Sequence, residues 1–216
     1  WDKDIIRAAH ARVALSLARI GQGDAALNSR LYAERSELPM SARAGLAESI
    51  ARTTGADARS SSLLRELEGH LEIQASYAVI NQENASRWAA LWEGSAAPTA
   101  ATVRALLVAD PTNPLLVRLV QGLVASRRDG RWGNTYTTLS SMAALVDYAE
   151  QFEDGALAQS VRVSLGNKEL LSGEFDGANP KRAVLPMSAL QAGQLSIQPQ
   201  GRVYWEAHLS YGLQNP

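Results

Sequence analysis

The chain has 216 residues, enough for one large domain or two small ones. Hydrophobic residues make up 46% and charged residues 20%, a balance typical of a globular protein with a filled core. The net charge of −1 comes from 21 basic and 22 acidic side chains, which argues against general binding to nucleic acid. Cysteine is absent, so disulfides, thiolate metal sites and a cysteine nucleophile are excluded within these residues. No apolar run approaches the roughly 20 residues that a membrane span needs.

The chain starts at Trp1 with neither an initiating methionine nor a signal-peptide pattern. A fragment or processed piece of a longer protein is the expectation, and an excised segment would also begin this way.

The first third of the chain reads as a series of helices. Residues 4–20 are expected to form the first, with one apolar face made by Ile5, Ala9, Val13, Leu17 and Ile20. Asp24 is expected to cap a second helix over residues 25–33.

Two more helices follow. The third is expected over residues 41–53, with Ser41 as its cap and Leu46, Ala47 and Ile50 facing inward. The serines at 60–62 are expected to cap a shorter helix over residues 63–67.

The segment from His70 to Ile80 alternates between apolar and polar residues, which predicts a strand or extended arm. Trp88 and Trp92 follow at a spacing of four, which would place them on one face of a helix. They could line a pocket, but packing in the core or at an interface is the favoured interpretation.

The middle of the chain returns to helices. One is expected to begin at Pro98-Thr99, and another at Pro114 after a cap by Asn113. Consecutive helices joined by short turns indicate antiparallel helical hairpins.

The stretch from Arg128 to Thr138 stands where the helical half of the sequence ends. Asp129-Gly130 is a tight-turn signal, and Gly133 gives a second backbone position without a side chain. Asn134 or Thr135 is expected to cap a helix that runs to about residue 150. Trp132 can fold back as a hydrophobic plug whose indole N–H bonds a nearby carbonyl. From the residues alone, the stretch is a well-made helix start with a buried tryptophan.

The helix after this stretch has apolar residues at spacings of three and four, which predicts one apolar stripe. Its members are Tyr136, Leu139, Met142, Ala143, Val146 and Ala149.

After Gly155 the pattern changes to short strands. They are expected at residues 161–165, 169–175, 184–187, 194–198 and 203–211, with a turn at Gly166-Asn167. In the last strand Trp205 lies on the same face as Val203 and Leu209. The sequence therefore predicts an α+β protein: a helical domain at 1–156 and an antiparallel β segment at 157–216.

Residues that could carry chemistry are few. The three histidines, His10, His70 and His208, are far apart in sequence and form no metal-binding pattern. The acidic residues form no aspartate-rich metal–diphosphate motif, and the serine-hydrolase and phosphate-loop motifs are absent. We expect no catalytic residue, no cofactor and no metal in this chain.

The run from Asp129 to Thr135, opening a long helix, resembles the last helical hairpin of the thioester domain in alpha-2-macroglobulin-like proteins. That domain is an α/α toroid, and the earlier hairpins resemble its preceding layers. The strand set that ends at residues 201–211 resembles the CUB-like β segment that follows the toroid. The resemblance covers nearly the whole chain and is greatest to the bacterial branch. It implies a structural part for Asp129, Gly130, Trp132, Gly133 and Trp205.

The resemblance further implies a fragment of a broad-spectrum protease-trapping inhibitor of the periplasm or cell envelope, with no catalysis in this piece. Its partners would be target proteases, through the full-length protein, and other domains of the same polypeptide. Nucleic acid is not an expected partner, and membrane anchoring would occur only through a missing N-terminal region. The family's thioester joins a cysteine to a glutamine, so it would lie outside this cysteine-free chain. Tyr136 also stands where the family often has glutamine.

Two other functions stay open at the level of sequence. One is an α/α-toroid enzyme of the cyclase or glycan-processing type, which would need acids converging in the ring cavity. The other is a stand-alone binding module that stacks a ligand on Trp88, Trp92 and Trp132.

Overall fold

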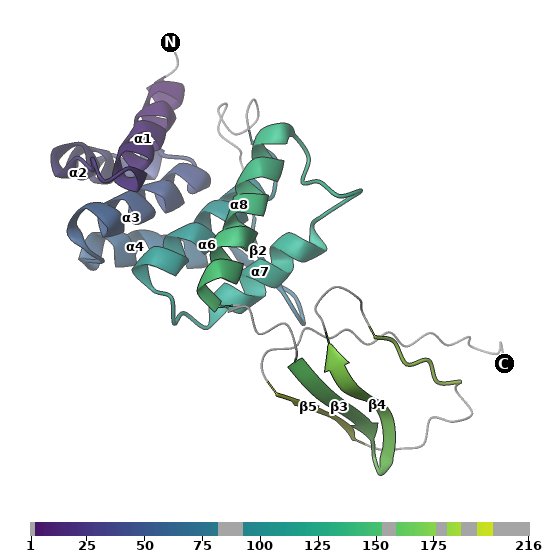
Figure 1. Cartoon of the computed structure of the whole chain (residues 1–216). Helices are drawn as coiled ribbons and strands as arrows, with labels where there is room; N and C mark the ends of the chain where they lie inside the picture. Colours follow the sequence, from purple (N-terminus) through teal and green to yellow (C-terminus); the bar gives the residue numbers. More distant parts are fainter. Residues whose placement is uncertain (1–2, 82–92, 153–158, 176–180, 187–193, 201–216) are drawn as a thin grey trace. The chain divides into compact units, whose positions relative to one another are not determined.

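The computed structural model describes residues 3–81, 93–152, 159–175, 181–186 and 194–200. The chain divides into two compact units, Trp1–Phe152 and Glu153–Pro216. The first contains the helices and the second a small antiparallel sheet, so the predicted α+β class is confirmed (Figure 1).

Four helices of the first unit pack one after another in a single layer. They are α1 (Lys3–Arg19), α3 (Met40–Thr54), α6 (Ala97–Ala109) and α8 (Thr135–Phe152). A second layer covers them, made of α2 (Ala25–Ala33), α4 (Ala58–Glu68) and α7 (Leu115–Ala125), with a 3-10 turn at Arg35–Glu37. The chain alternates between the layers, which gives the expected antiparallel hairpins.

Helix starts follow local capping chemistry. Asp24 accepts hydrogen bonds from the backbone N–H groups of Ala26 and Leu27 at 2.8 and 3.0 Å, as expected. The predicted cap of α4 is wrong: Asp57 begins the helix, and Ser60 completes a capping box from inside it. The predicted cap of α3 is also wrong, because Pro39 precedes the helix and Ser41 lies within it.

The segment at residues 70–80 is a hairpin rather than one strand. Strand β1 (Leu71–Ile73) pairs antiparallel with β2 (Ala78–Ile80), and a hydrogen bond from Gln74 N to Tyr77 O closes the turn. Strand β2 packs so closely on α7 that a Cβ added to Gly122 would lie 2.0 Å from the carbonyl oxygen of Ala78. The period of two was read correctly, but it continued across a turn that the pattern did not reveal.

The second unit holds a three-stranded antiparallel sheet in the order β4-β3-β5. These strands are β3 (Gln159–Leu165), β4 (Lys168–Phe175) and β5 (Leu195–Pro199), which agree with three of the predicted strands. Residues 181–186 form no strand, so the prediction at 184–187 is wrong for its described part. One physical reason is that Pro186 has no backbone N–H and so cannot donate a hydrogen bond to a neighbouring strand. The strand predicted at 203–211, with Trp205, lies outside the described residues.

The core of the helical unit is centred on α3 and α6. Leu46, Ile50, Val103 and Leu106 are all at most 2% exposed. Within the described residues, no helix is both long enough and apolar enough to cross a bilayer.

Candidate functional site

The loop between α7 and α8 contains a two-residue hairpin. Asp129 has φ 49° and Gly130 has φ 82°, and the backbones of Arg128 and Arg131 exchange two hydrogen bonds of 3.0 Å. Positive φ at both central residues is the geometry that Asp-Gly favours in type I′ turns. The turn predicted from this dipeptide is confirmed.

Trp132 leaves this hairpin and enters the core. Its side chain is 5% exposed, and its indole N–H donates a hydrogen bond to the carbonyl oxygen of Leu123 near the end of α7. The guanidinium carbon of Arg127 lies 5.8 Å from the ring centroid. A buried ring offers no face on which a ligand could stack. The hypothesis of a binding module that stacks its ligand on Trp132 is therefore wrong for this residue. Trp88 and Trp92, its proposed companions, lie outside the described residues.

The start of α8 is fastened by two side chains. Asn134 Oδ1 accepts a hydrogen bond from the N–H of Thr137 at 2.8 Å, which makes Asn134 the cap. Thr137 in turn accepts from the N–H of Gly94 at 2.7 Å, linking α8 to the segment before α6. Gly133, with φ 71°, turns the chain between Trp132 and this cap. These hydrogen bonds connect the loop to the start of α8 and to the segment before α6.

The apolar stripes predicted on α1 and α8 do not face the core. On α8, Leu139 is 67% exposed, Met142 52% and Val146 51%, whereas the buried residues are Thr137, Ser141, Ala144 and Tyr148. On α1 the core face consists of Ala8, Ala11, Ala14 and Ala18, whereas Val13, and Ile20 directly after the helix, are exposed. The core faces of both helices therefore consist of small residues and a few larger ones, because small side chains allow close helix packing, and the apolar stripes lie on other faces.

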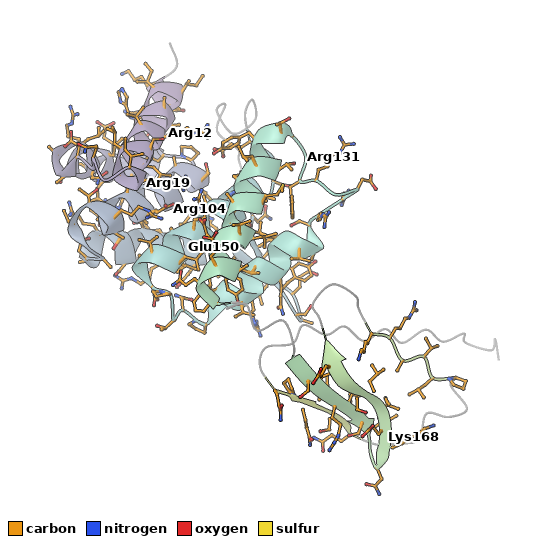
Figure 2. The ribbon with its side chains drawn as sticks, viewed as in Figure 1. Arg12, Arg19, Arg104, Arg131, Glu150 and Lys168 are labelled. Carbon is orange, nitrogen blue, oxygen red and sulfur yellow. The ribbon has the colours of Figure 1, made fainter. Side chains whose placement is uncertain are left out.

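A cleft of about 250 Å³ lies between α1, α3, α6 and α8. We call it the arginine cleft, because Arg12, Arg19 and Arg104 line it together with Glu93 and Tyr136. Figure 2 shows the three arginines in one region of the helical unit, where α1 and α8 lie on either side. Its other walls include small residues from all four helices: Ala11, Ala42, Gly45, Ala97, Ala101 and Ala143.

Glu48 of α3 anchors the charges behind this cleft. Its side chain is 1% exposed, and it accepts hydrogen bonds from Arg19 at 2.7 and 2.9 Å and from Arg52 at 2.8 Å. Burial raises the pKa of Glu48, but the hydrogen bonds from Arg19 and Arg52 and the charges of Arg19 and Arg104 outweigh it, and the pKa lies below its usual value. Glu48 is therefore an ionised structural carboxylate.

A second acid, Glu93, lines the cleft itself. Its side chain is 2% exposed, accepts a hydrogen bond from the hydroxyl of Ser41 at 2.6 Å and lies 3.6 Å from Arg12. The guanidinium of Arg12 also stacks 4.2 Å above the ring centroid of Tyr136, a cation–π contact. Burial raises the pKa of the Tyr136 hydroxyl, so it stays a neutral donor near neutral pH.

Sequence reasoning missed this cleft. Its charged residues come from positions as far apart as Arg12 and Arg104, so no local motif predicts them. The available signal was Glu48, a charged residue among the small and apolar residues Leu46, Ala47, Ser49 and Ile50 of α3. The described residues contain no group of three potential metal ligands, and His208 is not among them.

Comparisons with known proteins place this geometry in a wider context. No family model matches the chain. An alpha-2-macroglobulin homolog of the cyanobacterium Nostoc sp. is 24% identical over 209 residues, which cover 93% of this chain and 11% of the relative.

Two crystal structures of Salmonella alpha-2-macroglobulin have a similar fold. The protein reacted with methylamine gives a TM-score of 0.50 at 20% identity, covering 80% of this chain and 10% of that one. A point mutant of the same protein gives a TM-score of 0.52 at 18% identity, and the match covers 92% of this chain and 12% of the mutant's chain. The chain therefore resembles bacterial alpha-2-macroglobulins over most of its length, and it spans about a tenth of the proteins it matches.

Proposed function

We propose that this chain is part of a bacterial alpha-2-macroglobulin-like inhibitor that traps proteases, and that its own part is mechanical. The observation that carries the proposal is the agreement of sequence and fold over 80 to 93% of the chain with proteins of this kind. In such a trap, proteolysis of a bait segment triggers a change of shape that encloses the protease. Residues 1–156 would form part of the α/α toroid and residues 157–216 the CUB-like segment.

The exposed apolar stripes support this proposal. Leu139, Met142 and Val146 on α8, with Val13 on α1 and Ile20 directly after it, are each more than half exposed. Exposed large apolar side chains that gather on one unit are typical of surfaces that another protein segment covers. Because the matched relatives are about nine times longer than the aligned part, we assign these faces to other domains of the same polypeptide.

The charges in the cleft argue for a mechanical rather than an enzymatic role. A general acid at neutral pH needs a raised pKa, but the pKa of Glu48 is lowered by its two arginines. The two buried acids at the cleft in the described part of the chain, Glu48 and Glu93, are thus engaged in ion pairs. We further propose that any thioester lies in another part of the polypeptide, and that the protein works in the periplasm or cell envelope.

The test uses the full-length polypeptide and trypsin. After incubation, trypsin activity is measured on a small chromogenic peptide and on casein. A trap predicts that casein cleavage falls at least ten-fold while cleavage of the small peptide persists, because the enclosed active site stays open to small molecules. Equal loss of both activities would indicate an ordinary active-site inhibitor, and unchanged casein cleavage would exclude a trap.

The same assay tests the mechanical role of α8. Met142→Asp in the full-length protein is expected to weaken the protection of casein, because a charge on the stripe opposes packing against the next domain. Val124→Asp on α7 changes a side chain of similar exposure, 58%, outside the stripe and is the matched control. Equal behaviour of the two variants would contradict the assignment of the stripe.

A further inference from the structure

The loop between α7 and α8 presents three arginines to solvent. They are Arg127, Arg128 and Arg131, and we call them the basic tip. All three side chains are exposed, and none forms an ion pair with any residue that the structure describes. This distinguishes them from the arginines of the cleft, each of which has an acid beside it.

The basic tip belongs to a stretch with an excess of positive charge. Residues 111–146 contain a single acid, Asp129, and four arginines: Arg118, Arg127, Arg128 and Arg131. Four positive charges and one negative charge give this stretch a net charge of +3, whereas the whole chain carries −1. Asp129 is itself exposed and forms no ion pair in the described part of the chain. The positive charge of the basic tip is therefore available to an anionic partner.

The hairpin holds the basic tip away from the helices. The backbones of Arg128 and Arg131 exchange two hydrogen bonds of 3.0 Å, and the buried Trp132 fixes the base of the loop. Figure 2 shows Arg131 on this loop, which projects from the helical unit. A projecting tip can reach a flat surface, because neither partner then needs a cavity.

The exposed face of α7 adds apolar side chains next to the basic tip. Val124 is 58% exposed and Val117 is 41% exposed. They are seven residues apart, about two helical turns, so they lie on the same side of α7. Val124 comes three residues before Arg127. Basic residues combined with exposed apolar side chains are typical of surfaces that bind at the boundary between lipid headgroups and acyl chains.

The small size of this surface favours a lipid bilayer over a macromolecular partner. A specific protein interface buries about 800 Å² and about 20–30 residues on each side, far more than the basic tip and two valines provide. Binding to nucleic acid typically uses about 6–10 phosphate contacts. A bilayer has no such requirement, because each arginine near anionic headgroups strengthens binding about five-fold by itself. The planar guanidinium also matches the geometry of a phosphate group.

We propose that the basic tip and Val124 make a peripheral contact with a bilayer that contains anionic phospholipids. The guanidinium groups donate hydrogen bonds to the headgroup phosphates, and Val124 lies at the boundary with the acyl chains. The contact attaches the chain to the surface and inserts no helix. This inference does not depend on the trap proposed above, because it rests only on α7 and its hairpin.

The experiment measures binding of the 216-residue chain to vesicles by co-sedimentation. Vesicles of phosphatidylcholine alone are compared with vesicles that contain about 30% phosphatidylglycerol, an anionic lipid. We expect binding to the anionic vesicles to be stronger by about ten-fold or more, and to be largely lost at about 0.5 M salt, which screens exposed charges. Equal binding to the two kinds of vesicle, or binding to neither, would overturn the proposal. Displacement by an equal phosphate concentration of soluble glycerol phosphate would indicate a site for single phosphates and would also overturn it.

Variants locate the contact. The first replaces the whole basic tip: Arg127→Gln, Arg128→Gln and Arg131→Gln. It is expected to weaken binding to the anionic vesicles by about twenty-fold or more, because the contributions of the three arginines multiply. The matched control removes three exposed basic charges elsewhere on the helical unit: Lys3→Gln, Arg30→Gln and Arg65→Gln. It should weaken binding by about two-fold at most, because distant charges are screened. Equal losses in the two variants would mean non-specific attraction and would contradict the site.

The lack of cysteine in this chain makes a direct test of orientation possible. Val124→Cys provides a single thiol for an environment-sensitive fluorophore, whose emission should shift to the blue when anionic vesicles are added. Ala56→Cys, at an exposed position between α3 and α4, is the matched control and should show no shift. Equal shifts at both positions, or no shift at Val124, would contradict this face as the contact. Circular dichroism reports that each variant is folded.

Discussion

Helices α3 and α8 are similar in length, yet their surroundings differ. α3 has α1, α2, α4 and α6 packed around it and buries residues on nearly its whole circumference, including the charged Glu48. α8 packs mainly on α6 and buries one narrow face made of Thr137, Ser141, Ala144 and Tyr148. Its larger apolar residues stay exposed.

This difference shows that burial in the helical unit follows position in the layer more than residue type. A central helix can hold a carboxylate in the core because arginines reach it from a neighbouring helix and from its own next turn. An edge helix keeps leucine and methionine in solvent because nothing among the described residues covers that face. The following predictions test this comparison, from the largest expected effect to the smallest.

Trp132→Ala should remove the buried indole that packs before α8 and bonds the carbonyl oxygen of Leu123 in α7. Deleting a buried indole leaves a cavity and costs about 3–5 kcal/mol of unfolding free energy. Urea denaturation followed by circular dichroism measures this. Trp132→Phe is the control: it keeps much of the ring but loses the bond to Leu123, and about 1–2 kcal/mol is expected. A change below about 1 kcal/mol in the alanine variant would mean that the role of Trp132 is not structural.

Glu48→Gln tests the central helix. Removing one member of a buried ion pair costs about 3 kcal/mol, because Arg19 and Arg52 keep their charges. The exposed Glu150→Gln on α8 should change stability by less than about 0.5 kcal/mol. Comparable effects at both positions would contradict the contrast between the two helices.

The Glu48→Gln variant and the unchanged protein can also be compared as a function of pH. The pKa of Glu48 in the folded state lies below its ordinary value of 4.5, so this residue contributes stability above that pH. The contribution is lost as the pH falls through the lowered pKa. Denaturation between pH 7 and pH 3 should therefore show a shallower acid loss for Glu48→Gln than for the unchanged protein. Parallel curves would mean that Glu48 is not ionised in the fold.

Gly122→Ala tests the close contact of α7 with β2. A new methyl group would meet the carbonyl oxygen of Ala78, and the backbones must move apart. We expect a loss of about 1–3 kcal/mol, although alanine favours helix more than glycine does. Gain of stability in thermal denaturation would show that the two elements are not in contact.

Leu139→Ala should have the smallest effect, within about 0.5 kcal/mol, because most of this side chain is in solvent. Leu46→Ala on α3 makes the same chemical change at a fully buried site and should cost about 2–5 kcal/mol. The ratio of the two losses of unfolding free energy measures directly how the edge helix α8 differs from the central helix α3. Similar losses would place Leu139 in the core.

Local signals in the sequence predicted local structure well. The Asp129-Gly130 turn, the Asn134 cap and the Asp24 cap each depend on side chains adjacent to the backbone they satisfy. The strands of the second unit were also found, because their period of two is independent of distant contacts. Ser41 failed as a cap because its hydroxyl donates to Glu93, 52 residues away.

Which face of a helix is buried could not be predicted in the same way. An apolar stripe shows that a face can be covered, but the packing partner decides whether it is. On α1 the close approach to α3 favours alanine, so the core face is made of Ala8, Ala11, Ala14 and Ala18 rather than of the bulkier residues. The arginine cleft was invisible for a related reason: its residues come together only when four helices have packed.

The central claim is that these residues are one part of a much larger trap. Top-down mass spectrometry of the native polypeptide in its source cells tests this claim most directly. We predict a mass several times the 23.2 kDa of this chain. A native polypeptide of 23.2 kDa would contradict the claim, because the exposed stripes would then have no domain of their own chain to cover them.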